Sequence, residues 1–305
     1  MTLRACIKSF RLRTLPLSLS GVAAGVCAAT AICDTPAPGT ALVFLTAALL
    51  QILSNLSNEL GDTLNGTDGE DRQGIRYSLQ EGDMEIADMK RLIACTAAAC
   101  CVSGLAMVFL SFGTLLAAEP LLLIALGAAA IWAAVKYTLG KNPYGYRGLG
   151  DIFVFIFFGP VSCCGACYIG AHALGLQAVM KASLLPACAI GLFSVGVLNV
   201  NNIRDAVTDA ATRTTVAIQL GEHRARIYQS ALIAAGWLLM ILSVFVRDFG
   251  KSAAAWLFML TLPLYILHLK GVWTKKGKAL DPMLPLLVMS TFALAVLAGL
   301  GMLVR

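Results

Sequence analysis

Residues 55–68 read NLSNELGDTLNGTD and close an apolar segment, 39–60, that is long enough to cross a bilayer. Asn58 and Asp62 stand four residues apart in this stretch. On a helix, residues four apart lie on the same face, one turn above the other. A carboxylate in hydrocarbon is costly unless it faces a wet or occupied cavity. We therefore expect Asp62 to border a functional cavity at the membrane boundary.

A second stretch, residues 199–209, reads NVNNIRDAVTD and also follows an apolar segment. Asn201, Asp205 and Asp209 follow one another at intervals of four, so a helix places all three on one face. Two acidic faces that share one cavity can together hold divalent cations. The similar stretches predict a single transmembrane domain of two weakly related halves, about 1–140 and 141–305.

The composition is that of a membrane protein. Of 305 residues, 58% are hydrophobic and 13% are charged, and the mean hydropathy is +0.79. A soluble domain carries about 25% charged residues. Because about 20 apolar residues cross a bilayer, we predict an all-α, polytopic membrane protein with about nine transmembrane helices. The predicted spans are 15–33, 39–60, 92–117, 119–139, 149–171, 183–203, 227–246, 252–269 and 283–304.

The positive residues predict the orientation in the membrane. With the N-terminus inside, most of the 23 Lys and Arg residues fall in inner segments. The exceptions are Lys181, Arg247, Lys251 and Arg305. This asymmetry follows the positive-inside rule and places both acidic stretches on the cytoplasmic side. The net charge of +6 is therefore a topology signal, and no nucleic-acid-binding motif is present. The basic start runs into the first span, so we expect no cleaved signal peptide.

Cysteine and histidine do not form an evident metal or redox site. Cys164 and Cys167 have CxxC spacing, but they fall inside a predicted span and no second pair accompanies them. This favours a packing role. His172, His223 and His268 are isolated in the sequence and lack metal-ligand spacing. We expect no catalytic histidine.

Three arginines lie beside the predicted site. Arg13 precedes the first span, where it either anchors the chain at the interface or contacts a bound anion. Arg72 and Arg76 lie four residues apart in the polar loop that follows the first acidic stretch. Mixed charges in a loop often only face water, but guanidinium groups also suit phosphate oxygens. Both interpretations remain open from the residues alone.

An irregular loop follows the fourth predicted span. Residues 138–151 read TLGKNPYGYRGLGD, with several glycines and tyrosines and one proline, which favours a re-entrant or gating segment. Tyr137 and Lys141 are four residues apart. One helical turn would direct a phenol and an ammonium group at the same ligand, although tyrosine at a membrane surface often belongs only to the aromatic belt.

The residue types favour magnesium over zinc. Mg²⁺ prefers oxygen ligands and is usually held by one or two carboxylates together with substrate phosphates, whereas zinc sites use His and Cys. Basic residues beside the carboxylates suit a metal-bound diphosphate, and a diphosphate in a membrane cavity implies a lipid tail. The pattern predicts ionisation of an isoprenyl diphosphate. A cation-coupled transporter also uses acidic pairs, but it has less need of flanking basic residues.

Three motifs in order resemble the UbiA superfamily of intramembrane prenyltransferases. They are Asn-x-x-x-Asp-x-x-x-Gly-x-Asp at 58–68, Tyr-Thr-x-Gly with Pro-Tyr-Gly-Tyr-x-Gly-Leu-Gly-Asp at 137–151, and Leu-Asn-x-Asn-Asn-x-Arg-Asp-x-x-x-Asp at 198–209. The resemblance runs over most of the chain and is closest to the menaquinone branch, which prenylates 1,4-dihydroxy-2-naphthoate.

This resemblance implies a helical bundle around a central cavity with a lateral opening for the prenyl tail. It implies Mg²⁺ as cofactor, polyprenyl diphosphate and 1,4-dihydroxy-2-naphthoate as substrates, and the bacterial inner membrane as location. The implied metal ligands are Asn58, Asp62, Asp68, Asp205 and Asp209. The implied diphosphate-binding residues are Asn58, Lys141 and Asn201, and to these we add the nearby arginines Arg72, Arg76 and Arg204. The implied catalytic residues are Asp62, Asp205, Asp209, Tyr137 and Lys141.

The chain departs from the family pattern in two places. Glu59 stands where the family usually has Asp, and residues 210–213 are shorter and less charged than usual. These departures leave a non-catalytic scaffold as one alternative, beside prenylation of another aromatic acceptor such as 4-hydroxybenzoate. The glycine- and tyrosine-rich loop favours the naphthoate branch.

Overall fold

The structure is a computed structural model that describes residues 2–34, 36–66, 77–246 and 252–304. Over these residues it is built from helices and short helical turns, without a β-sheet. In chain order they are α1 (Leu3–Phe10), η1 (Leu12–Thr14), α2 (Leu15–Ile32), α3 (Thr40–Leu64), α4 (Ile86–Phe112), α5 (Ala118–Lys136), η2 (Tyr144–Tyr146), α6 (Gly150–Ile156), η3 (Phe157–Val161), α7 (Ser162–Ala171), η4 (His172–Leu174), α8 (Gly175–Asp209), α9 (Val216–Leu220), α10 (Glu222–Val246), η5 (Ala253–Thr261), α11 (Leu262–Thr274), η6 (Gly277–Leu280) and α12 (Met283–Leu303).

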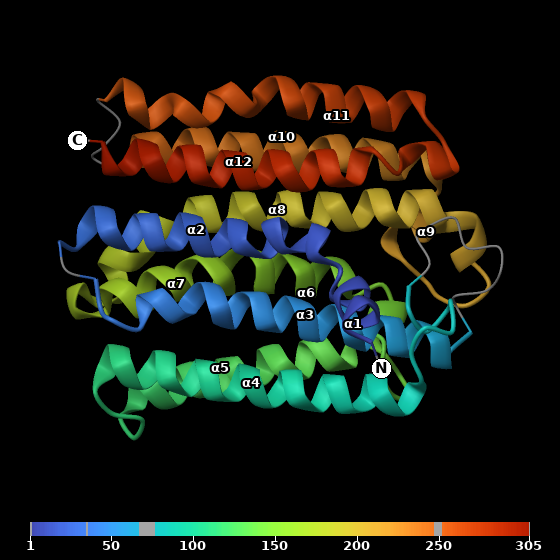
Figure 1. The fold of residues 1–305 in the computed structure, drawn as a ribbon. Helices are drawn as coiled ribbons and strands as arrows, with labels where there is room; N and C mark the ends of the chain where they lie inside the picture. Colours follow the sequence, from blue (N-terminus) through green and yellow to red (C-terminus); the bar gives the residue numbers. More distant parts are fainter. Residues whose placement is uncertain (1, 35, 67–76, 247–251, 305) are drawn as a thin grey trace.

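The described part of the chain contains eight helical segments long and apolar enough to cross a membrane. One of them, Gly150–Asp209, has 60 residues, far more than the about 20 that one crossing needs. The turn η4 divides it, and α8 returns antiparallel beside α6 and α7 (Figure 1). The all-helical, polytopic membrane fold is confirmed, and the nine predicted spans each coincide with a helical segment.

The helices form a layered bundle. Helices α10, α11 and α12 lie along one side, α4 and α5 lie along the opposite side, and α2, α3 and α6 to α8 fill the middle (Figure 1). Helices α3 and α8 run in the same direction and end at the same end of the bundle, beside α9. We call this the polar end, because both acidic stretches lie there. The fold therefore brings the two stretches to one end of the molecule.

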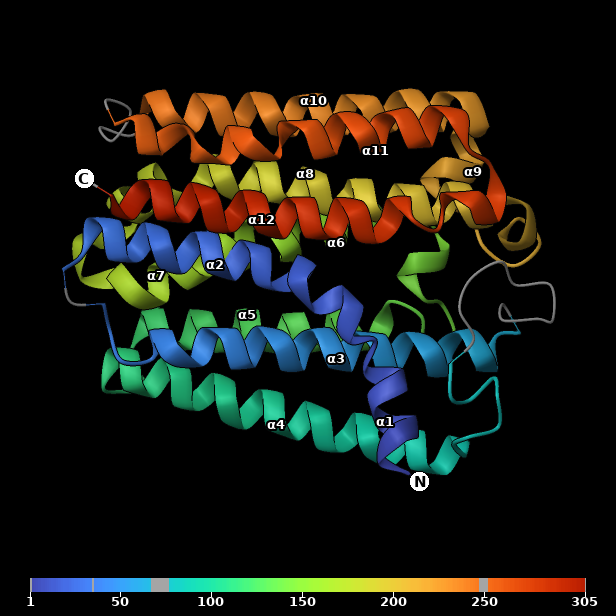
Figure 2. The ribbon, with the colours of Figure 1, turned by 45° about the horizontal axis from the view of Figure 1, so that its top comes forward.

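Helix α1 lies across the polar end, at an angle to α2 and α3 (Figure 2). Its first turn is capped by Thr2, whose Oγ1 accepts from the Ala5 amide at 3.3 Å. The chain then turns at Arg11, whose φ of +50° is rare for a residue with a side chain. Asn55 Nδ2 fixes the turn by donating to the Phe10 carbonyl at 2.8 Å. Asn55 is thus a structural residue that fastens α1 to α3.

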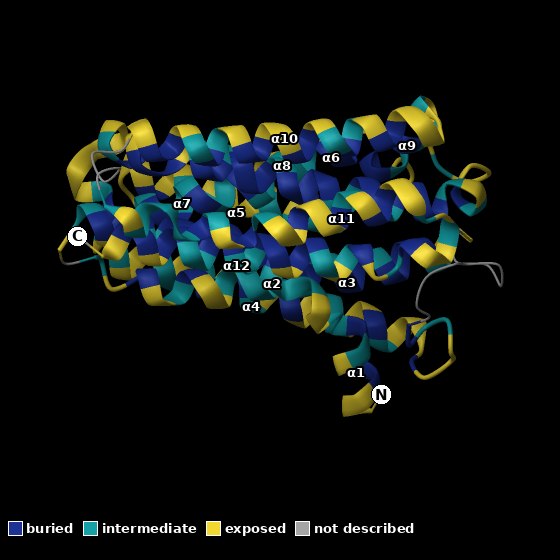
Figure 3. Ribbon diagram, turned by 90° about the horizontal axis from the view of Figure 1, so that it is seen from above, coloured by how far each residue is buried: buried dark blue, intermediate teal, exposed yellow. Residues whose placement is uncertain are grey.

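A large apolar core joins α8, α10 and the last two spans. Phe193, Trp237 and Leu287 are among its buried members. Gly236 faces the Phe193 ring so closely that an added Cβ would lie 2.4 Å from it, so only glycine permits this packing. The outward faces of α10 and α11 are largely exposed (Figure 3) and carry apolar side chains, as lipid-facing surfaces do.

The helix that follows the irregular loop is interrupted at its centre. The π-helical turn η3 contains Pro160, and such turns occur where an α-helix must accommodate an irregularity. Here α6–α7 approaches α8 very closely, since a Cβ on Gly159 would lie 2.6 Å from the Ala187 carbonyl oxygen. Phe157 and Val161 of this turn line the cavity described next.

Candidate active site

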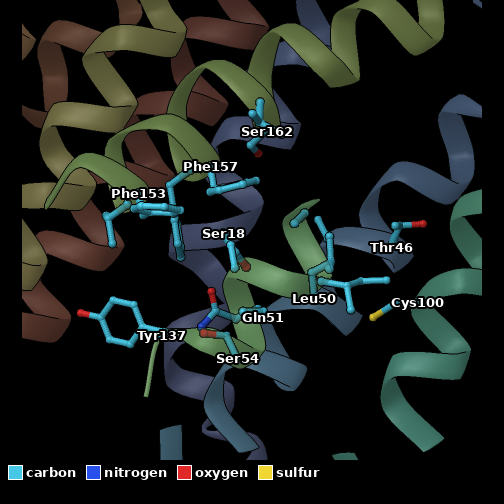
Figure 4. A pocket seen from close by; sticks show the side chains of 18 of the residues that line it. Ser18, Thr46, Leu50, Gln51, Ser54, Cys100, Tyr137, Phe153, Phe157 and Ser162 are labelled. Atoms are coloured by element: carbon cyan, nitrogen blue, oxygen red, sulfur yellow. The ribbon is translucent and has the colours of Figure 1, made fainter. Parts of the chain in front are cut away.

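A cavity of about 720 Å³ extends from the polar end into the middle of the bundle, between α2, α3, α4, α5 and the α6–α8 hairpin. Its wall is polar at one end, where Asn58, Asp62 and Asn201 contribute. The rest is mainly apolar, with Phe153 and Phe157 among its lining residues (Figure 4). One continuous space therefore joins charged groups to a hydrocarbon-like interior.

Asp62 lies in the wall of this cavity, buried near the end of α3. The Tyr146 hydroxyl donates to its Oδ1 at 2.7 Å. Arg213 Nη1 lies 4.0 Å from the same oxygen. Tyr146 and Arg213 come from the irregular loop and from the segment after α8, so the fold itself gathers these groups around Asp62.

Asp209 is buried at the last residue of α8 and pairs with the same arginine. Arg213 Nη2 lies 2.5 Å from Asp209 Oδ2. The Arg213 side chain is 16% exposed and lines the cavity. Arg213 therefore stands between Asp62 and Asp209 and connects the two acidic stretches that the sequence predicts to meet.

Asp205 is held by a different arginine. Arg204 donates from Nε to Asp205 Oδ1 at 2.8 Å and from Nη2 to Oδ2 at 2.6 Å. Its other bonds go from Nη2 to Asn201 Oδ1 at 2.9 Å and from Nη1 to Asp281 Oδ1 at 2.6 Å. Arg204 and Asn201 line the cavity. This network fixes Asp205 through the buried Arg204 side chain, and Asp281 belongs to it although no sequence motif indicated its role.

Asn58 faces the cavity one turn before Asp62 and contacts Thr138, whose hydroxyl lies 3.3 Å from Asn58 Oδ1. The same hydroxyl donates to the Ser57 carbonyl at 3.0 Å. Gly61 allows this approach, since a Cβ there would lie 2.4 Å from Thr138 Oγ1. These contacts hold the start of the irregular loop against α3.

Tyr137 caps α5 and lines the cavity, and its ring meets Tyr144 edge-on with centroids 5.4 Å apart. Burial raises the pKa of Tyr137 to about 12, with Arg213 opposing and nearby carboxylates, Asp62 among them, adding to the rise. The phenol stays protonated at neutral pH. It can therefore act as a hydrogen-bond donor to an anion.

Lys141 does not accompany Tyr137. Helix α5 ends at Lys136, and Gly140 has a φ of +107°, which interrupts any further helical turn. Lys141 is exposed and does not line the cavity. The expectation that one helical turn directs Tyr137 and Lys141 at the same ligand is therefore wrong for this conformation.

The two acidic stretches and the irregular loop border one cavity, and comparison with known proteins identifies the family. A model described as the UbiA prenyltransferase family matches residues 18–289. The chain belongs to the UbiA prenyltransferase family.

Two relatives of this UbiA family member are similar over nearly their whole length. A 1,4-dihydroxy-2-naphthoate octaprenyltransferase of Escherichia coli is 38% identical, over 92% of the chain and 89% of the relative. One of Haemophilus influenzae is 33% identical, over 96% and 94%. A less similar relative is UbiA prenyltransferase domain-containing protein 1 of Dictyostelium discoideum, at 31% over 59% and 52%. The resemblance inferred from the motifs is confirmed.

Solved structures share the fold. An apo UbiA homolog from Aeropyrum pernix superposes with a TM-score of 0.70 at 18% identity, covering 97% of this chain and 98% of that one. A UbiA homolog from Archaeoglobus fulgidus, bound to DMAPP and Mg²⁺, gives a TM-score of 0.62 at 14% identity, covering 95% and 99%. At these identities the likeness establishes the bundle architecture.

The donor atoms of the UbiA site have the chemistry that Mg²⁺ prefers, namely carboxylate and amide oxygens. Over the described residues, however, no three acidic, His or Cys side chains stand close enough to form a ready-made metal site. Arginines hold Asp205 and Asp209 instead. This fits a metal that is bound by one or two carboxylates together with substrate phosphates, rather than by a complete protein cage.

Two further basic groups face the cavity from the N-terminal segment. Arg13 Nη2 donates to the Tyr77 hydroxyl at 2.8 Å, and the Arg11 guanidinium stacks over the Tyr77 ring at 3.8 Å. Both arginines line the cavity. Of the two interpretations of Arg13, this placement favours contact with a bound anion. The spacing of basic residues at the start of the chain could have indicated Arg11 as well.

The remaining predictions have separate outcomes. Asp68, Arg72 and Arg76 lie outside the described residues, so their roles stay predictions. Glu59 faces away from the metal-binding face: it is buried, and its Oε1 accepts from the Leu79 amide at 2.9 Å. The Asp-to-Glu departure thus concerns the attachment of a loop. The departure at 210–213 places Arg213 between Asp62 and Asp209. The sequence interpretation did not assign Arg213 to the site, although its spacing of four residues from Asp209 was an available signal.

The apolar part of the cavity has open space at three glycines. Gly127 on α5 and Gly165 on α7 would have no atom within 4 Å of an added Cβ, and Gly104 on α4 would only touch Thr46 at 4.0 Å. All three line the cavity. Their missing side chains widen it, whereas most helical glycines elsewhere in the bundle allow close helix contacts.

Proposed function

We propose that this protein transfers a polyprenyl group from polyprenyl diphosphate to 1,4-dihydroxy-2-naphthoate, with loss of CO₂, in a Mg²⁺-dependent reaction. The observation that carries the proposal is the single cavity that joins carboxylates and arginines at the polar end to a long apolar interior. Such a space suits a substrate with a charged head and a hydrocarbon tail. The names of the relatives at 38% and 33% identity support the naphthoate acceptor over 4-hydroxybenzoate.

In this proposal the acidic face of each stretch holds metal and diphosphate. Asn58, Asp62, Asp205 and Asp209 would supply the protein oxygens. Mg²⁺ bound there would neutralise charge on the departing diphosphate. Asn201 and the arginines around it would orient the diphosphate oxygens, because guanidinium N–H groups match phosphate geometry.

The proposed reaction breaks one C–O bond and one C–C bond and forms one new C–C bond. The allylic C–O bond breaks, and its electron pair leaves with the diphosphate. The naphthoate carbon that bears the carboxylate donates a π pair to the allylic carbon and forms the new C–C bond. The bond to the carboxylate carbon then breaks, CO₂ leaves, and the ring recovers aromaticity as the reduced, dihydroxy form of demethylmenaquinone.

The protein residues would favour this sequence by excluding water and by placing donors. Tyr137 would donate its phenolic hydrogen to the leaving diphosphate, since it stays protonated at neutral pH. Phe153 and Phe157 would cover the allylic carbon and keep water from it. Catalysis thus would rest on electrostatic stabilisation and positioning.

We infer that the protein works in a bacterial cytoplasmic membrane with the polar end facing the cytoplasm. The protein is an integral membrane protein of the UbiA family. The distribution of Lys and Arg supports the orientation, because the segments at the polar end are the basic ones.

The test is a prenyl-transfer assay with protein in liposomes, 1,4-dihydroxy-2-naphthoate and allylic diphosphates of several lengths, with Mg²⁺ or with excess EDTA. We expect metal-dependent formation of the reduced, dihydroxy form of demethylmenaquinone and equimolar CO₂. Prenylation of 4-hydroxybenzoate alone would replace the proposed acceptor. No transfer to either acceptor would contradict the proposal and favour the transporter or non-catalytic alternatives.

A further inference from the structure

Arg213 occupies the space between the two acidic stretches. Its Nη2 lies 2.5 Å from Asp209 Oδ2 and its Nη1 lies 4.0 Å from Asp62 Oδ1. These two carboxylates come from different halves of the chain, and both belong to the proposed metal site. The positive charge of Arg213 therefore lies close to both carboxylates.

The backbone keeps Arg213 in this place. The Arg213 amide donates to the Asp209 carbonyl at 3.0 Å, and the next amide, of Thr214, donates to the Tyr146 carbonyl at 2.9 Å. The Tyr146 hydroxyl in turn donates to Asp62, and its ring lies 5.8 Å from the Arg213 guanidinium carbon. The segment after α8 and the irregular loop therefore position the arginine from two sides.

The Arg213 guanidinium is charged and carries an N–H group that is not hydrogen-bonded within the described residues. Burial lowers the pKa of Arg213, but Asp209 and Asp62 outweigh this and raise it above its ordinary value. Its Nε–H is buried and finds no acceptor within the described part of the chain. Because Arg213 also lines the cavity, this N–H is available to an anion that enters.

We propose that Arg213 substitutes for a divalent cation between Asp62 and Asp209 in the substrate-free protein and turns to the diphosphate when metal and diphosphate enter together. The proposal rests on the proposed prenyl-transfer function. The backbone of Arg213 stays next to the site, because its amide donates to the Asp209 carbonyl at 3.0 Å. Once the metal neutralises the carboxylates, its donors are free to bind phosphate oxygens, which they match in geometry.

This exchange makes the protein select the metal together with its diphosphate. Metal alone must displace a guanidinium from two carboxylates, which weakens its binding. Metal with diphosphate offers the displaced guanidinium a new partner, so its binding is favoured. Arg213 thus acts as a positioning residue for the diphosphate and as a competitor of the free metal.

The experiment measures two affinities in Arg213→Gln and in the wild type, both in detergent. The first is for Mn²⁺ alone, followed by the electron paramagnetic resonance signal of the free ion. The second is for farnesyl thiolodiphosphate at saturating Mg²⁺, followed by calorimetry. We expect Mn²⁺ alone to bind roughly tenfold more tightly and the thiolodiphosphate roughly tenfold more weakly, the size of one charge-assisted contact.

Two variants control the result. Arg224→Gln removes the same charge from an exposed position on α10, and both affinities should stay within about twofold of wild type. Arg213→Lys keeps the charge without the planar fork, so Mn²⁺ alone should bind as in wild type while the thiolodiphosphate binds more weakly.

Unchanged affinities in Arg213→Gln and Arg213→Lys would overturn the role of Arg213 and leave the proposed function standing. If the wild-type protein binds no thiolodiphosphate with Mg²⁺, the proposed function fails and the exchange fails with it. Weaker Mn²⁺ binding in a folded Arg213→Gln protein would also overturn the exchange, because it would make Arg213 a support of the metal site.

Discussion

At the residue scale, the buried carboxylates of this protein differ in the arginine that each one contacts. Asp205 is fixed by Arg204, whereas Asp209 and Asp62 share Arg213. An unpaired carboxylate in this setting would carry a large desolvation cost. The arginines offset part of that cost through ion pairs with the carboxylates. They also explain why the carboxylates can be buried at the membrane boundary.

The first prediction concerns the carboxylates. Asp62→Ala and Asp205→Ala should each lower the rate of prenyl transfer at least about 100-fold, the usual cost of removing a group that stabilises developing charge. Initial rates at saturating Mg²⁺ provide the measurement. Glu85→Gln, at an exposed position at the same end of the bundle, should retain wild-type activity. Near-normal turnover in either Asp variant would disprove the metal-site assignment.

The second prediction concerns Tyr137. Because its pKa is raised to about 12, its phenol remains protonated below about pH 10 and acts as a donor. Tyr137→Phe should lower the rate roughly tenfold, the effect of losing one hydrogen bond to a charged group. The shape of the rate profile between pH 6 and 9 should stay the same. A change in its alkaline limb would indicate that Tyr137 acts as a base.

At the element scale, the glycines of the helices have two different roles. Gly236 and Gly159 permit contacts that a Cβ would block, whereas Gly127 and Gly165 leave space inside the cavity. The two stretches resemble each other at this scale as well. Asn55 and Asn199 both use their amides to bind backbone carbonyls of other elements, at 2.8 Å and 3.0 Å. The division into two related halves stays a prediction.

The third prediction concerns the apolar part of the cavity, which we propose holds the prenyl tail. Gly127→Leu places a side chain in the open cavity, so transfer from an octaprenyl diphosphate should fall roughly tenfold or more. Transfer from geranyl diphosphate should change by less than about twofold, because a short tail does not need the added space. Competition between the two donors, with products separated by mass, measures the shift. Ala129→Leu, exposed on the same helix and away from the cavity, is the control.

Equal losses with both donors would contradict the placement of the tail beside α5. An effect in Ala129→Leu as large as in Gly127→Leu would contradict it too, since a general disturbance of the helix would then explain both.

At the scale of the whole molecule, the polar end holds the charged groups of the candidate site, and the last spans help to keep these groups in place. Arg204 donates to Asp281, just before α12, at 2.6 Å. The segment before the last span therefore contacts a residue of the site directly. The buried His268, bonded to Gln229 and to the Met283 carbonyl at 3.0 Å each, fastens the same spans. The absence of a catalytic histidine stays a prediction.

The fourth prediction concerns topology. With the N-terminus inside and nine crossings, alkaline phosphatase fused after Gly113 or after Val304 should be active, and a fusion after Lys278 should be inactive. Green fluorescent protein at the same three positions should give the opposite pattern. An inactive phosphatase fusion after Val304 would indicate an even number of crossings. Activity after Lys278 would contradict a cytoplasmic polar end.

The sequence by itself determined the spans, the two acidic faces and the family. Hydrophobic length and a spacing of four are local properties, and each is preserved when the helices pack. The sequence therefore predicted that the two acidic stretches share one cavity; Asp62 lines the cavity, whereas Asp209 contacts Arg213 of its wall. The sequence also showed that Glu59 departs from the family pattern, although only the fold showed that Glu59 attaches a loop.

Only the tertiary structure decided which groups contact each carboxylate. Tyr146 reaches Asp62 across a separation of 84 residues, and Arg213 reaches it from the opposite half of the chain. The same fold turns Lys141 away, because a positive φ at Gly140 interrupts the helical register. Such contacts depend on how separate elements pack and turn. No periodicity within a single segment encodes them.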